Sequence, residues 1–422
     1  MLKVKRGFGL NNYCMNNLKV LHLQYMTTEA SPGNRLHKAF LDAGINSSLL
    51  SLHTELDEQK NLFSLGRNSR WISKLNNRTE SYLKRKMTSE FGIFSYPVIG
   101  SNISEMNVVL EADVIYIHWV LNGFLSLKNI EQLVKLNKPI IFFMHDMWTI
   151  TGGCHHSFGC DKYLEHCHNC KFFIGDKKND LATSEFKKKK KLFSTYDNVH
   201  FIAPSKWLFE CAKQSALTKE KPVFYIPNYL DEKTFKPFDK NIAKNILNIE
   251  KDDYVIAFGA ISIDSPYKGW KYLQKALEIM KEDGCFKNVS VLIFGSGYNK
   301  EVAEAIPFKT KFMGFLTNEY ATNLMYNAAD VFLAPSLADN LPYSILESQN
   351  CGTPVVAFNI GGIPDLIEHK GNGYLADYKD SIDLAKGIKY CIDNNLKGYA
   401  LQEFDGDLIM RKHLSLIEQI LN

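Results

Sequence analysis

Short apolar runs alternate with amphipathic segments along most of this chain. The runs at 18–25, 112–119, 138–146, 254–260 and 331–336 are short and rich in β-branched and aromatic residues, which favours buried strands. The segments between them have helical spacing, and one of them, at 35–44, ends at Gly44. Strands that alternate with helices predict parallel sheets of the doubly wound α/β class.

The pattern divides into two halves joined by a segment that interrupts regular structure. Residues 223–237 contain Pro227, Asn228 and Pro237, which favour turns and a linker. We expect an N-terminal extension at 1–17, a Rossmann-like domain at 18–236, a second at 237–403, and a helix at 404–422 that packs back on the first domain. The polar, basic stretch at 54–105 is expected to form an inserted helix and loops that face solvent.

Length and composition are those of a soluble two-domain protein. The chain has 422 residues, 45% hydrophobic and 23% charged, which is enough for two domains with a core each. The net charge of +4 is too modest to indicate nucleic acid, and no apolar run approaches the ~20 residues of a membrane span. The first 17 residues lack the apolar centre of a secretory signal, so we expect a cytoplasmic protein.

Two carboxylates flank a predicted strand-to-helix turn. The run 331–336 predicts a strand and 344–351 a helix, so Asp339 lies in the loop and Glu347 about one turn inside the helix. Acids placed in this way can each bind vicinal hydroxyls, such as those of a sugar and a ribose. By spacing alone, a capped helix with one exposed acid is the more common explanation.

Several glycine turns and strand ends add candidate binding positions. Gly33 follows the first strand, and Lys268 and Gly269 precede a predicted helix, where a cation and a helix N-terminus suit an anion. The turn at 361–367 (GGIPDLI) predicts a further helix with free backbone N–H groups. His118 and His145 follow buried strands, where ligands gather in parallel sheets. Most residues in such positions are structural.

These residues resemble the retaining GT-B glycosyltransferases of family 4. The E-x7-E signature of that family falls on Asp339 and Glu347, with Asp in place of the first Glu, and CGTPVV and GGIPDLI match the segments that follow. The segment IPNYLDEKTFKP resembles the family's hinge, and HDMWTITGGCHH resembles a bacterial subgroup associated with surface polysaccharides of the colanic acid or capsule type. The resemblance implies a GT-B fold, in which two Rossmann-like domains face each other across a cleft.

The resemblance also implies an activity and a set of site residues. It implies transfer of a sugar from a nucleotide-sugar to a hydroxyl of a saccharide or lipid-linked acceptor, with retained configuration and the departing phosphate as base. The implied catalytic residues are His145, Lys268, Asp339 and Glu347. The implied substrate contacts are Gly33, Lys268, Phe315, Leu316, Asp339, Asn340, Leu341 and Glu347. No acid cluster of the DxD type is evident, so no catalytic metal is expected.

Four cysteines lie within 17 residues of one another in the first half. Cys154, Cys160, Cys167 and Cys170 have the spacing C-x5-C-x6-C-x2-C, which predicts a structural zinc site that braces a loop. A neighbouring histidine as ligand, disulfides, and free thiols remain as alternatives.

Five consecutive lysines occupy 187–191. Such a run usually forms a solvated helix face. Because the acceptor of many relatives is lipid-linked, peripheral contact with an anionic membrane is a second interpretation.

Two other classes of protein fit parts of the sequence. Another enzyme of this fold, such as a nucleotide-sugar epimerase or a phosphorylase, would need catalytic groups that the sequence does not place. A non-catalytic zinc-containing binding protein for nucleic acid would need more stacking aromatics around the cysteines than Phe158 and Tyr163. We therefore expect a nucleotide-sugar donor and no nucleic acid as partner.

Overall fold

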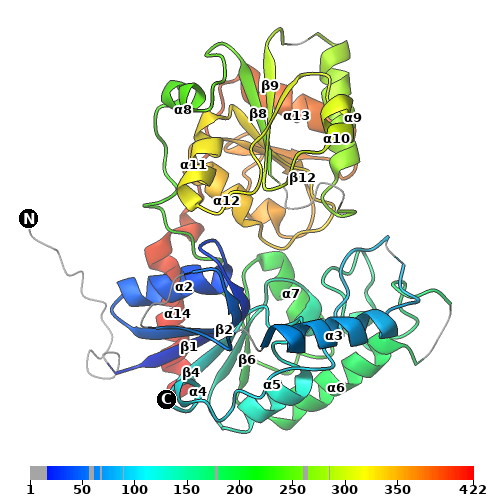
Figure 1. Cartoon of the computed structure of the whole chain (residues 1–422), viewed down its shortest axis with the longest axis vertical. Helices are drawn as coiled ribbons and strands as arrows, with labels where there is room; N and C mark the ends of the chain where they lie inside the picture. Colours follow the sequence, from blue (N-terminus) through cyan, green and yellow to red (C-terminus); the bar gives the residue numbers. More distant parts are fainter. Residues whose placement is uncertain are drawn as a thin grey trace, which may run out of the picture.

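The computed structural model describes residues 17–56, 61–66, 69–88, 90–175, 179–259, 265–284 and 286–422. The predicted extension at 1–17 lies outside these ranges except for Asn17. The chain forms two α/β units, one above the other, each built on a parallel sheet (Figure 1). This arrangement confirms the predicted doubly wound class.

The N-terminal sheet has seven strands in the order β3-β2-β1-β4-β5-β6-β7, and every pair is parallel. Its strands are β1 (Lys19–Thr27), β2 (Asn46–Thr54), β3 (Leu62–Ser64), β4 (Val114–Ile117), β5 (Ile140–Phe143), β6 (Val199–Ala203) and β7 (Val223–Tyr225). Its helices and 3-10 turns are α2 (Pro32–Asp42), α3 (Arg70–Leu83), α4 (Asn107–Leu110), α5 (Leu127–Val134), η2 (Trp148–Ile150), η3 (Lys162–Leu164), α6 (Leu181–Thr195) and α7 (Lys206–Gln214).

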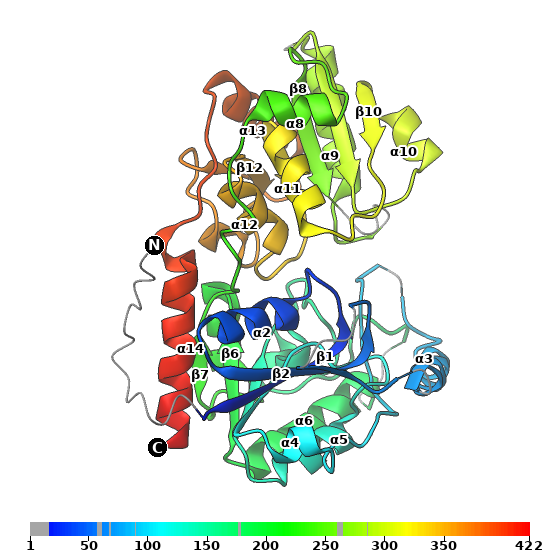
Figure 2. The same cartoon turned by 60° about the vertical axis from the view of Figure 1, so that its left-hand side comes forward.

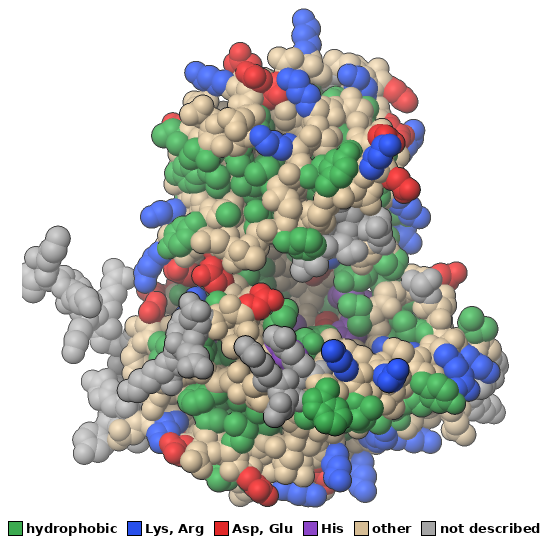
Figure 3. All heavy atoms as spheres, viewed as in Figure 1, with side chains coloured by type: hydrophobic (Ala, Val, Ile, Leu, Met, Phe, Trp, Pro, Cys, Tyr) green, Lys and Arg blue, Asp and Glu red, His purple; other side chains and the backbone are tan. Residues whose placement is uncertain are grey.

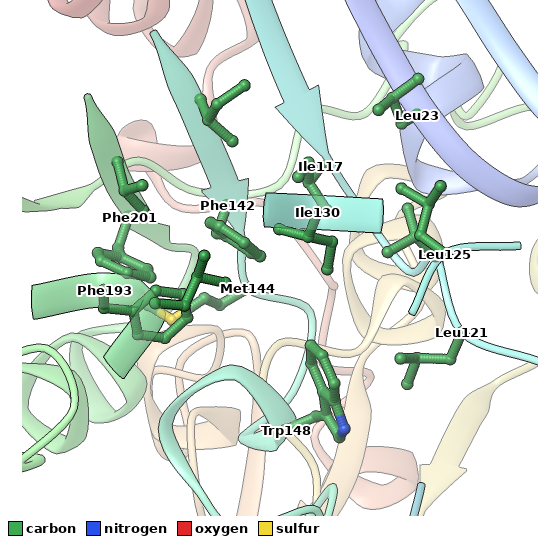
Figure 4. Close-up of a cluster of buried hydrophobic side chains, with 14 of the residues drawn as sticks. Leu23, Ile117, Leu121, Leu125, Ile130, Phe142, Met144, Trp148, Phe193 and Phe201 are labelled. Atoms are coloured by element: carbon green, nitrogen blue, oxygen red, sulfur yellow. The ribbon is translucent and has the colours of Figure 1, made fainter. Parts of the chain in front are cut away.

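This sheet is buried on both faces because successive side chains of a strand point to opposite sides. In β1, Leu21 and Leu23 join a core shared with α5 and α6, whereas Val20 joins a core shared with α2. Figure 4 shows part of the first core, where side chains of neighbouring strands pack above Trp148.

The C-terminal helix α14 (Gly406–Leu421) lies against the N-terminal unit (Figure 2). Its apolar face, with Ile409, Leu414 and Ile417, is part of the same core as Val20. His413 also accepts or donates a hydrogen bond of 3.1 Å with the Tyr116 hydroxyl. The chain therefore returns to its first unit after completing the second.

The C-terminal sheet has six parallel strands in the order β10-β9-β8-β11-β12-β13. Its strands are β8 (Tyr254–Gly259), β9 (Val289–Phe294), β10 (Lys309–Phe312), β11 (Val331–Ala334), β12 (Val355–Phe358) and β13 (Gly373–Ala376). Its helices and 3-10 turns are α8 (Lys240–Ile246), α9 (Trp270–Glu282), α10 (Lys300–Ala305), α11 (Glu319–Ala328), α12 (Tyr343–Asn350), η4 (Ile363–Asp365), α13 (Ser381–Asp393) and η5 (Gln402–Phe404). The first sheet ends at Tyr225 and the second begins at Tyr254, and a boundary at 236/237 remains a proposal.

Two details of the sequence interpretation were wrong. The stretch 54–105 does not simply face solvent, because Phe94 and Ile103 are buried in the core beneath α5 and α6. The helix expected after GGIPDLI is the single 3-10 turn η4, since the chain turns toward β13 after Ile367. A turn of three residues lacks the aligned peptide groups that make a helix N-terminus an anion site.

The strand orders place a switch point in each sheet. In the N-terminal sheet the order reverses between β1 and β4, and in the C-terminal sheet between β8 and β11. Ligands of open parallel sheets bind beyond the carboxyl ends of the strands at such a point. The residues after β1, β4, β8 and β11 are therefore the positions to search for a site.

Candidate active site

Lys268 and Asp339 meet at the switch point of the C-terminal sheet. Lys268 follows β8, Asp339 follows β11, and their Nζ and Oδ2 atoms lie 3.2 Å apart. Burial alone would lower the pKa of Lys268, but the Asp339 carboxylate and the Tyr267 hydroxyl raise it. Lys268 therefore keeps its positive charge at the carboxyl ends of the strands of this sheet.

Two glycines allow the loops of this pair to pack closely. Gly269 has a φ of 68°, and a side chain there would collide with the carbonyl oxygen of Pro335. Gly361 has a φ of 58°, and a side chain there would collide with the backbone oxygen of Asp339. Only glycine combines this left-handed conformation with the absence of a Cβ.

Glu347 lies in α12 with both carboxylate oxygens bonded. Its Oε2 accepts a hydrogen bond of 2.9 Å from the Tyr326 hydroxyl, and its Oε1 lies 2.6 Å from Nη2 of Arg35. Arg35 belongs to α2 of the N-terminal unit and also pairs with Glu319 at 2.7 Å. Two carboxylates of one unit thus bind a guanidinium of the other.

Arg35 is buried in this contact. Its side chain is 5% exposed and its guanidinium carbon lies 4.5 Å from the centre of the Tyr343 ring. Burial would lower its pKa, but Glu347 and Glu319 raise it, so the group stays charged. The sequence analysis missed Arg35, because 312 residues separate it from Glu347 and no local pattern marks it.

His145 follows β5 on the opposite side of the cleft. Its Nε2 is 2.9 Å from Nδ1 of His118, and burial lowers its pKa to about 4 despite the nearby Asp146. Asp146 is held by His155, whose Nδ1 lies 2.6 Å from its Oδ2. Burial would raise the pKa of Asp146, but the contact with His155 lowers it.

Gly33 lies at the start of α2, beneath these histidines. Its N–H donates a hydrogen bond of 2.7 Å to the side-chain oxygen of Gln24, so it is already bonded in this structure. A side chain at this position would collide with Gln24 and lie 3.1 Å from a ring carbon of His118. The absence of a Cβ therefore lets the helix approach the ring.

Asn340 and Leu341 join the two units. The Asn340 side chain accepts a hydrogen bond of 2.5 Å from Ser205 and donates to the backbone oxygen of His145 at 3.2 Å. The Leu341 side chain is buried, and its carbonyl accepts from Asn228 at 2.9 Å. These bonds place the loop of Asp339 directly against the end of β5.

Phe315 and Leu316 differ in exposure. The Phe315 side chain is 65% exposed and its ring edge lies near Gly297, whereas Leu316 packs against the core of the C-terminal unit. Phe315 is thus available for contact with a planar ligand.

A cavity of about 630 Å³ adjoins Asp339 between the two units. Figure 3 shows histidine side chains in the hollow between the units. His156 is one of the residues that line the cavity. Burial lowers its pKa below the ordinary value, and the nearby carboxylates of Asp339 and Asp146 offset only part of this effect. Much of the cavity wall on the N-terminal side comes from residues 156–163 of the cysteine-rich insert (154–170), which the sequence analysis did not connect with the site.

The arrangement of the four cysteines of that insert does not support the predicted zinc site, which stays a prediction. Cys154, Cys160, Cys167 and Cys170 line one small cavity as free thiols. Burial raises the pKa of Cys154 to about 11 and that of Cys170 to about 12. Within the described ranges, no three Cys, His, Asp or Glu side chains are arranged so that they could hold a metal ion.

Comparisons with known sequences point to one family. Residues 252–394 match the family described as Glycosyl transferases group 1. An uncharacterized glycosyltransferase of Haemophilus influenzae is 29% identical over 133 residues, and this chain spans 37% of that protein. An uncharacterized glycosyltransferase of Methanocaldococcus jannaschii is 24% identical over 347 residues, which cover 75% of this chain and 85% of that protein. The Escherichia coli UDP-Gal:alpha-D-GlcNAc-diphosphoundecaprenol alpha-1,3-galactosyltransferase is 26% identical over 179 residues, covering 40% and 45%.

Solved structures share the fold along the whole chain. The sucrose-phosphate synthase of Thermosynechococcus elongatus superposes with a TM-score of 0.59 and 15% identity, covering 96% of this chain and 95% of that one. The Anabaena protein HepE, in complex with UDP-glucose, gives a TM-score of 0.55 and 16% identity, covering 96% and 98%. The predicted GT-B fold is confirmed. Residues 252–394 of the C-terminal unit are thus similar to the Glycosyl transferases group 1, and the whole chain has the GT-B fold.

Proposed function

We propose that the protein transfers a sugar from a nucleotide-sugar to a hydroxyl of a saccharide or lipid-linked acceptor, with retention of anomeric configuration. The observation that carries this proposal is the Lys268–Asp339 pair at the switch point between β8 and β11, with Glu347 on the next helix. In this proposal Lys268 binds the diphosphate, Asp339 the sugar hydroxyls and Glu347 the ribose.

The charge that develops on the leaving group explains how a lysine at this position would assist the reaction. The nucleoside diphosphate gains negative charge as the glycosidic bond lengthens, so a cation at its oxygens stabilises the transition state more than the ground state. HepE, which shares the fold, binds UDP-glucose, and the E. coli relative uses UDP-Gal, which supports a nucleotide-sugar donor. That relative acts on a diphosphoundecaprenol-linked sugar, which supports a place in surface polysaccharide synthesis.

Thermal-shift measurements with UDP-, GDP-, ADP- and dTDP-linked sugars test the donor site. A donor present at about 100 times its Kd stabilises the folded protein by about 2.7 kcal/mol. We expect one nucleotide to raise the melting temperature of the wild type and to lose that effect in Glu347→Gln and Asp339→Asn. Glu304→Gln, at a surface glutamate of α10, is the matched control. No shift with any donor would count against the proposed function.

Retention is tested on the product. NMR of the first product formed from an α-linked donor should show the α configuration at the new linkage. A β product would contradict transfer to the same face of the sugar.

The cavity beside Asp339 is our proposed acceptor site. Its volume of about 630 Å³ is in the range of small-ligand pockets, and its lining includes Phe91, Phe158 and Trp207. The charged groups that line it are the carboxylates of Glu90, Asp161 and Asp339 and the ammonium of Lys379. Because carboxylates outnumber the lysine, we propose that an uncharged sugar ring enters this cavity and that any diphosphate of the acceptor stays outside.

Saturation-transfer NMR with methyl glycosides and with glucose 1-phosphate tests this acceptor site. We expect methyl glycosides of the matching sugar to give signals that Phe158→Ala and Trp207→Ala remove, while the donor-induced thermal shift stays. Tyr298→Ala, at a 70% exposed ring outside the cavity, is the control. Stronger binding of glucose 1-phosphate would contradict an uncharged occupant.

We also propose that α6 contacts an anionic membrane surface through its exposed lysines, which would bring the enzyme to a lipid-linked acceptor. The supporting observation is the number of lysines that remain exposed on this helix, and the test is argued in the Discussion.

A further inference from the structure

Three histidines form a row from the buried sheet to the cleft. His22 in β1, His118 after β4 and His145 after β5 come from adjacent strands. Nδ1 of His22 lies 3.1 Å from Nε2 of His118, and Nδ1 of His118 lies 2.9 Å from Nε2 of His145. Their rings are stacked, with centroids 5.4 Å and 5.2 Å apart.

All three imidazoles are neutral at ordinary pH. The His22 side chain is 0% exposed and that of His118 is 7% exposed, and burial lowers the pKa of both well below 6.5. Burial lowers the pKa of His145 to about 4. A neutral imidazole carries one N–H and one bare nitrogen, so each ring in the row donates in one direction only.

The inner end of the row decides the direction. Nε2 of His22 is buried and has no hydrogen-bond partner among the described residues. If the protons pointed inward, this nitrogen would be a buried N–H without an acceptor, and buried N–H groups without partners are rarer than unsatisfied acceptors. The proton of His22 therefore lies on Nδ1 and is donated to His118.

The same direction continues to the cleft. Since His118 accepts at Nε2, its proton lies on Nδ1 and is donated to Nε2 of His145. His145 then has its own proton on Nδ1, a nitrogen that makes no hydrogen bond with the described part of the chain. The site thus receives an N–H donor at this position.

We propose that His118 and His22 are positioning residues that hold His145 in the Nδ1–H tautomer, so that His145 donates a hydrogen bond to an oxygen of the donor sugar. This inference rests on the proposed function, which assigns His145 to the sugar. A protonated Nδ1 of His145 can donate a hydrogen bond that orients a sugar oxygen, but it cannot take a proton from the hydroxyl of the acceptor substrate. General-base catalysis by His145 is therefore excluded, and the departing phosphate is left as the base.

The backbone of Gly33 in α2 packs closely against the ring of His118. A Cβ at Gly33 would lie 3.1 Å from Cδ2 of His118, so glycine allows α2 to pack against the ring without displacing it. The row is thus built from residues of three strands and the helix between β1 and β2.

Nitrogen-15 NMR of histidine-labelled protein tests the tautomer directly and needs no substrate. We expect His145 in the wild type to show a protonated Nδ1 and a bare Nε2. In His118→Phe, which keeps a stacked ring but no donor, the Nε2–H form of His145 should become populated. In His118→Asn, an amide N–H near the position of Nδ1 should restore the wild-type pattern.

Kinetics with the donor found by thermal shift provide the second readout. We expect His118→Phe to lower kcat by about 10-fold, the lower end of the effects seen when the partner of a ligating imidazole is removed in metal sites. His118→Asn should recover most of this loss, and the thermal shift with the free nucleotide should stay unchanged. His413→Phe removes another buried imidazole that is not bonded to this row, and it is the control.

The outcomes separate this inference from the proposed function. A wild-type His145 protonated on Nε2, or an unchanged tautomer in His118→Phe, would overturn the inference whatever the activity. Absence of sugar transfer by the wild type would count against the proposed function, while the NMR result would still decide the tautomer.

Discussion

At the scale of single residues, burial decides the role of Lys189. It lies within the run of five lysines, yet its side chain is 0% exposed and lies over the Trp148 ring, 3.5 Å from its centre. Its Nζ donates to the carbonyl oxygens of Trp148 and Thr151. The charge pattern predicted five solvated lysines, and the structure shows that one of them braces the loop after β5.

Lys189→Met should change stability in a pH-dependent way. Burial lowers the pKa of Lys189 to about 8, from 10.5 when unfolded, so the unfolded state binds more protons between these pH values. The free energy of unfolding of the wild type therefore gains a contribution as pH rises from 8 to 10.5, roughly 3 kcal/mol in total. Urea titrations at several pH values should show that the free energy of unfolding of the wild type rises relative to that of Lys189→Met between pH 8 and 10.5.

Lys190→Met is the control for that series. Lys190 is the next residue of α6 and is exposed, so its replacement should leave the pH dependence unchanged. A constant difference in unfolding free energy between wild type and Lys189→Met from pH 7 to 10 would contradict a lowered pKa at Lys189.

The candidate site was predictable only in part at this scale. Asp339, Glu347 and Lys268 could be found because each lies within a local pattern of sequence, in a loop after a strand or, for Glu347, in the helix that follows the loop. Arg35 could not, because its partners lie on another unit and are identified only by the packing of α2 against α11 and α12. The row of three histidines could not be predicted either, because it comes from β1, β4 and β5, which are neighbours in the sheet but far apart in the sequence.

At the scale of elements, α6 has one buried and one exposed surface. Phe186, Lys189 and Phe193 are buried, whereas Lys187, Lys188, Lys190 and Lys191 are exposed. Figure 3 shows Lys and Arg side chains gathered over the part of the N-terminal unit where α3 and α6 lie. In the described ranges, no helix combines the length and apolar composition needed to cross a bilayer.

Replacing the four exposed lysines of α6 by glutamine should weaken binding to anionic vesicles. Each lysine near an anionic surface contributes about 1 kcal/mol. We expect the wild type to co-sediment with phosphatidylcholine vesicles that contain phosphatidylserine, and the variant to stay in solution. Lys189 is left in place because its loss would affect folding.

The control removes the same kind of charge from the other unit. Lys271, Lys275 and Lys281 in α9 are replaced by glutamine, and this variant should bind vesicles like the wild type. Equal retention of all three proteins, or no binding by the wild type, would contradict a membrane contact through α6.

At the scale of the whole molecule, hydrophobic periodicity was sufficient to predict the doubly wound α/β class, whereas the GT-B fold was predicted from the family resemblance. The apolar runs at 18–25 and 331–336 correspond to β1 and β11, and their alternation with helices leaves few topologies. Periodicity could not predict how the two units meet, since that contact depends on single polar pairs such as Ser205 with Asn340. It also could not predict that the cysteine-rich insert lines the cavity between the units.

The contact of Arg35 with Glu347 and Glu319 links the two units. A nucleotide whose ribose binds Glu347 must replace at least one of the two partners that now occupy its oxygens. Arg35→Met removes the cation and leaves the buried carboxylate of Glu347 and the partly buried carboxylate of Glu319 facing an apolar side chain. Breaking a buried ion pair in this way typically costs about 3–5 kcal/mol.

We therefore expect Arg35→Met to have a lower melting temperature and, in small-angle scattering, a larger radius of gyration than the wild type. The nucleotide-induced thermal shift should persist, because the variant keeps Glu347, Asp339 and Lys268. Lys38→Met removes a charge from the exposed side of the same helix and should change neither quantity. If Arg35→Met kept the wild-type radius of gyration but lost nucleotide binding, Arg35 would be a ligand of the nucleotide and the contact between the units would not depend on it.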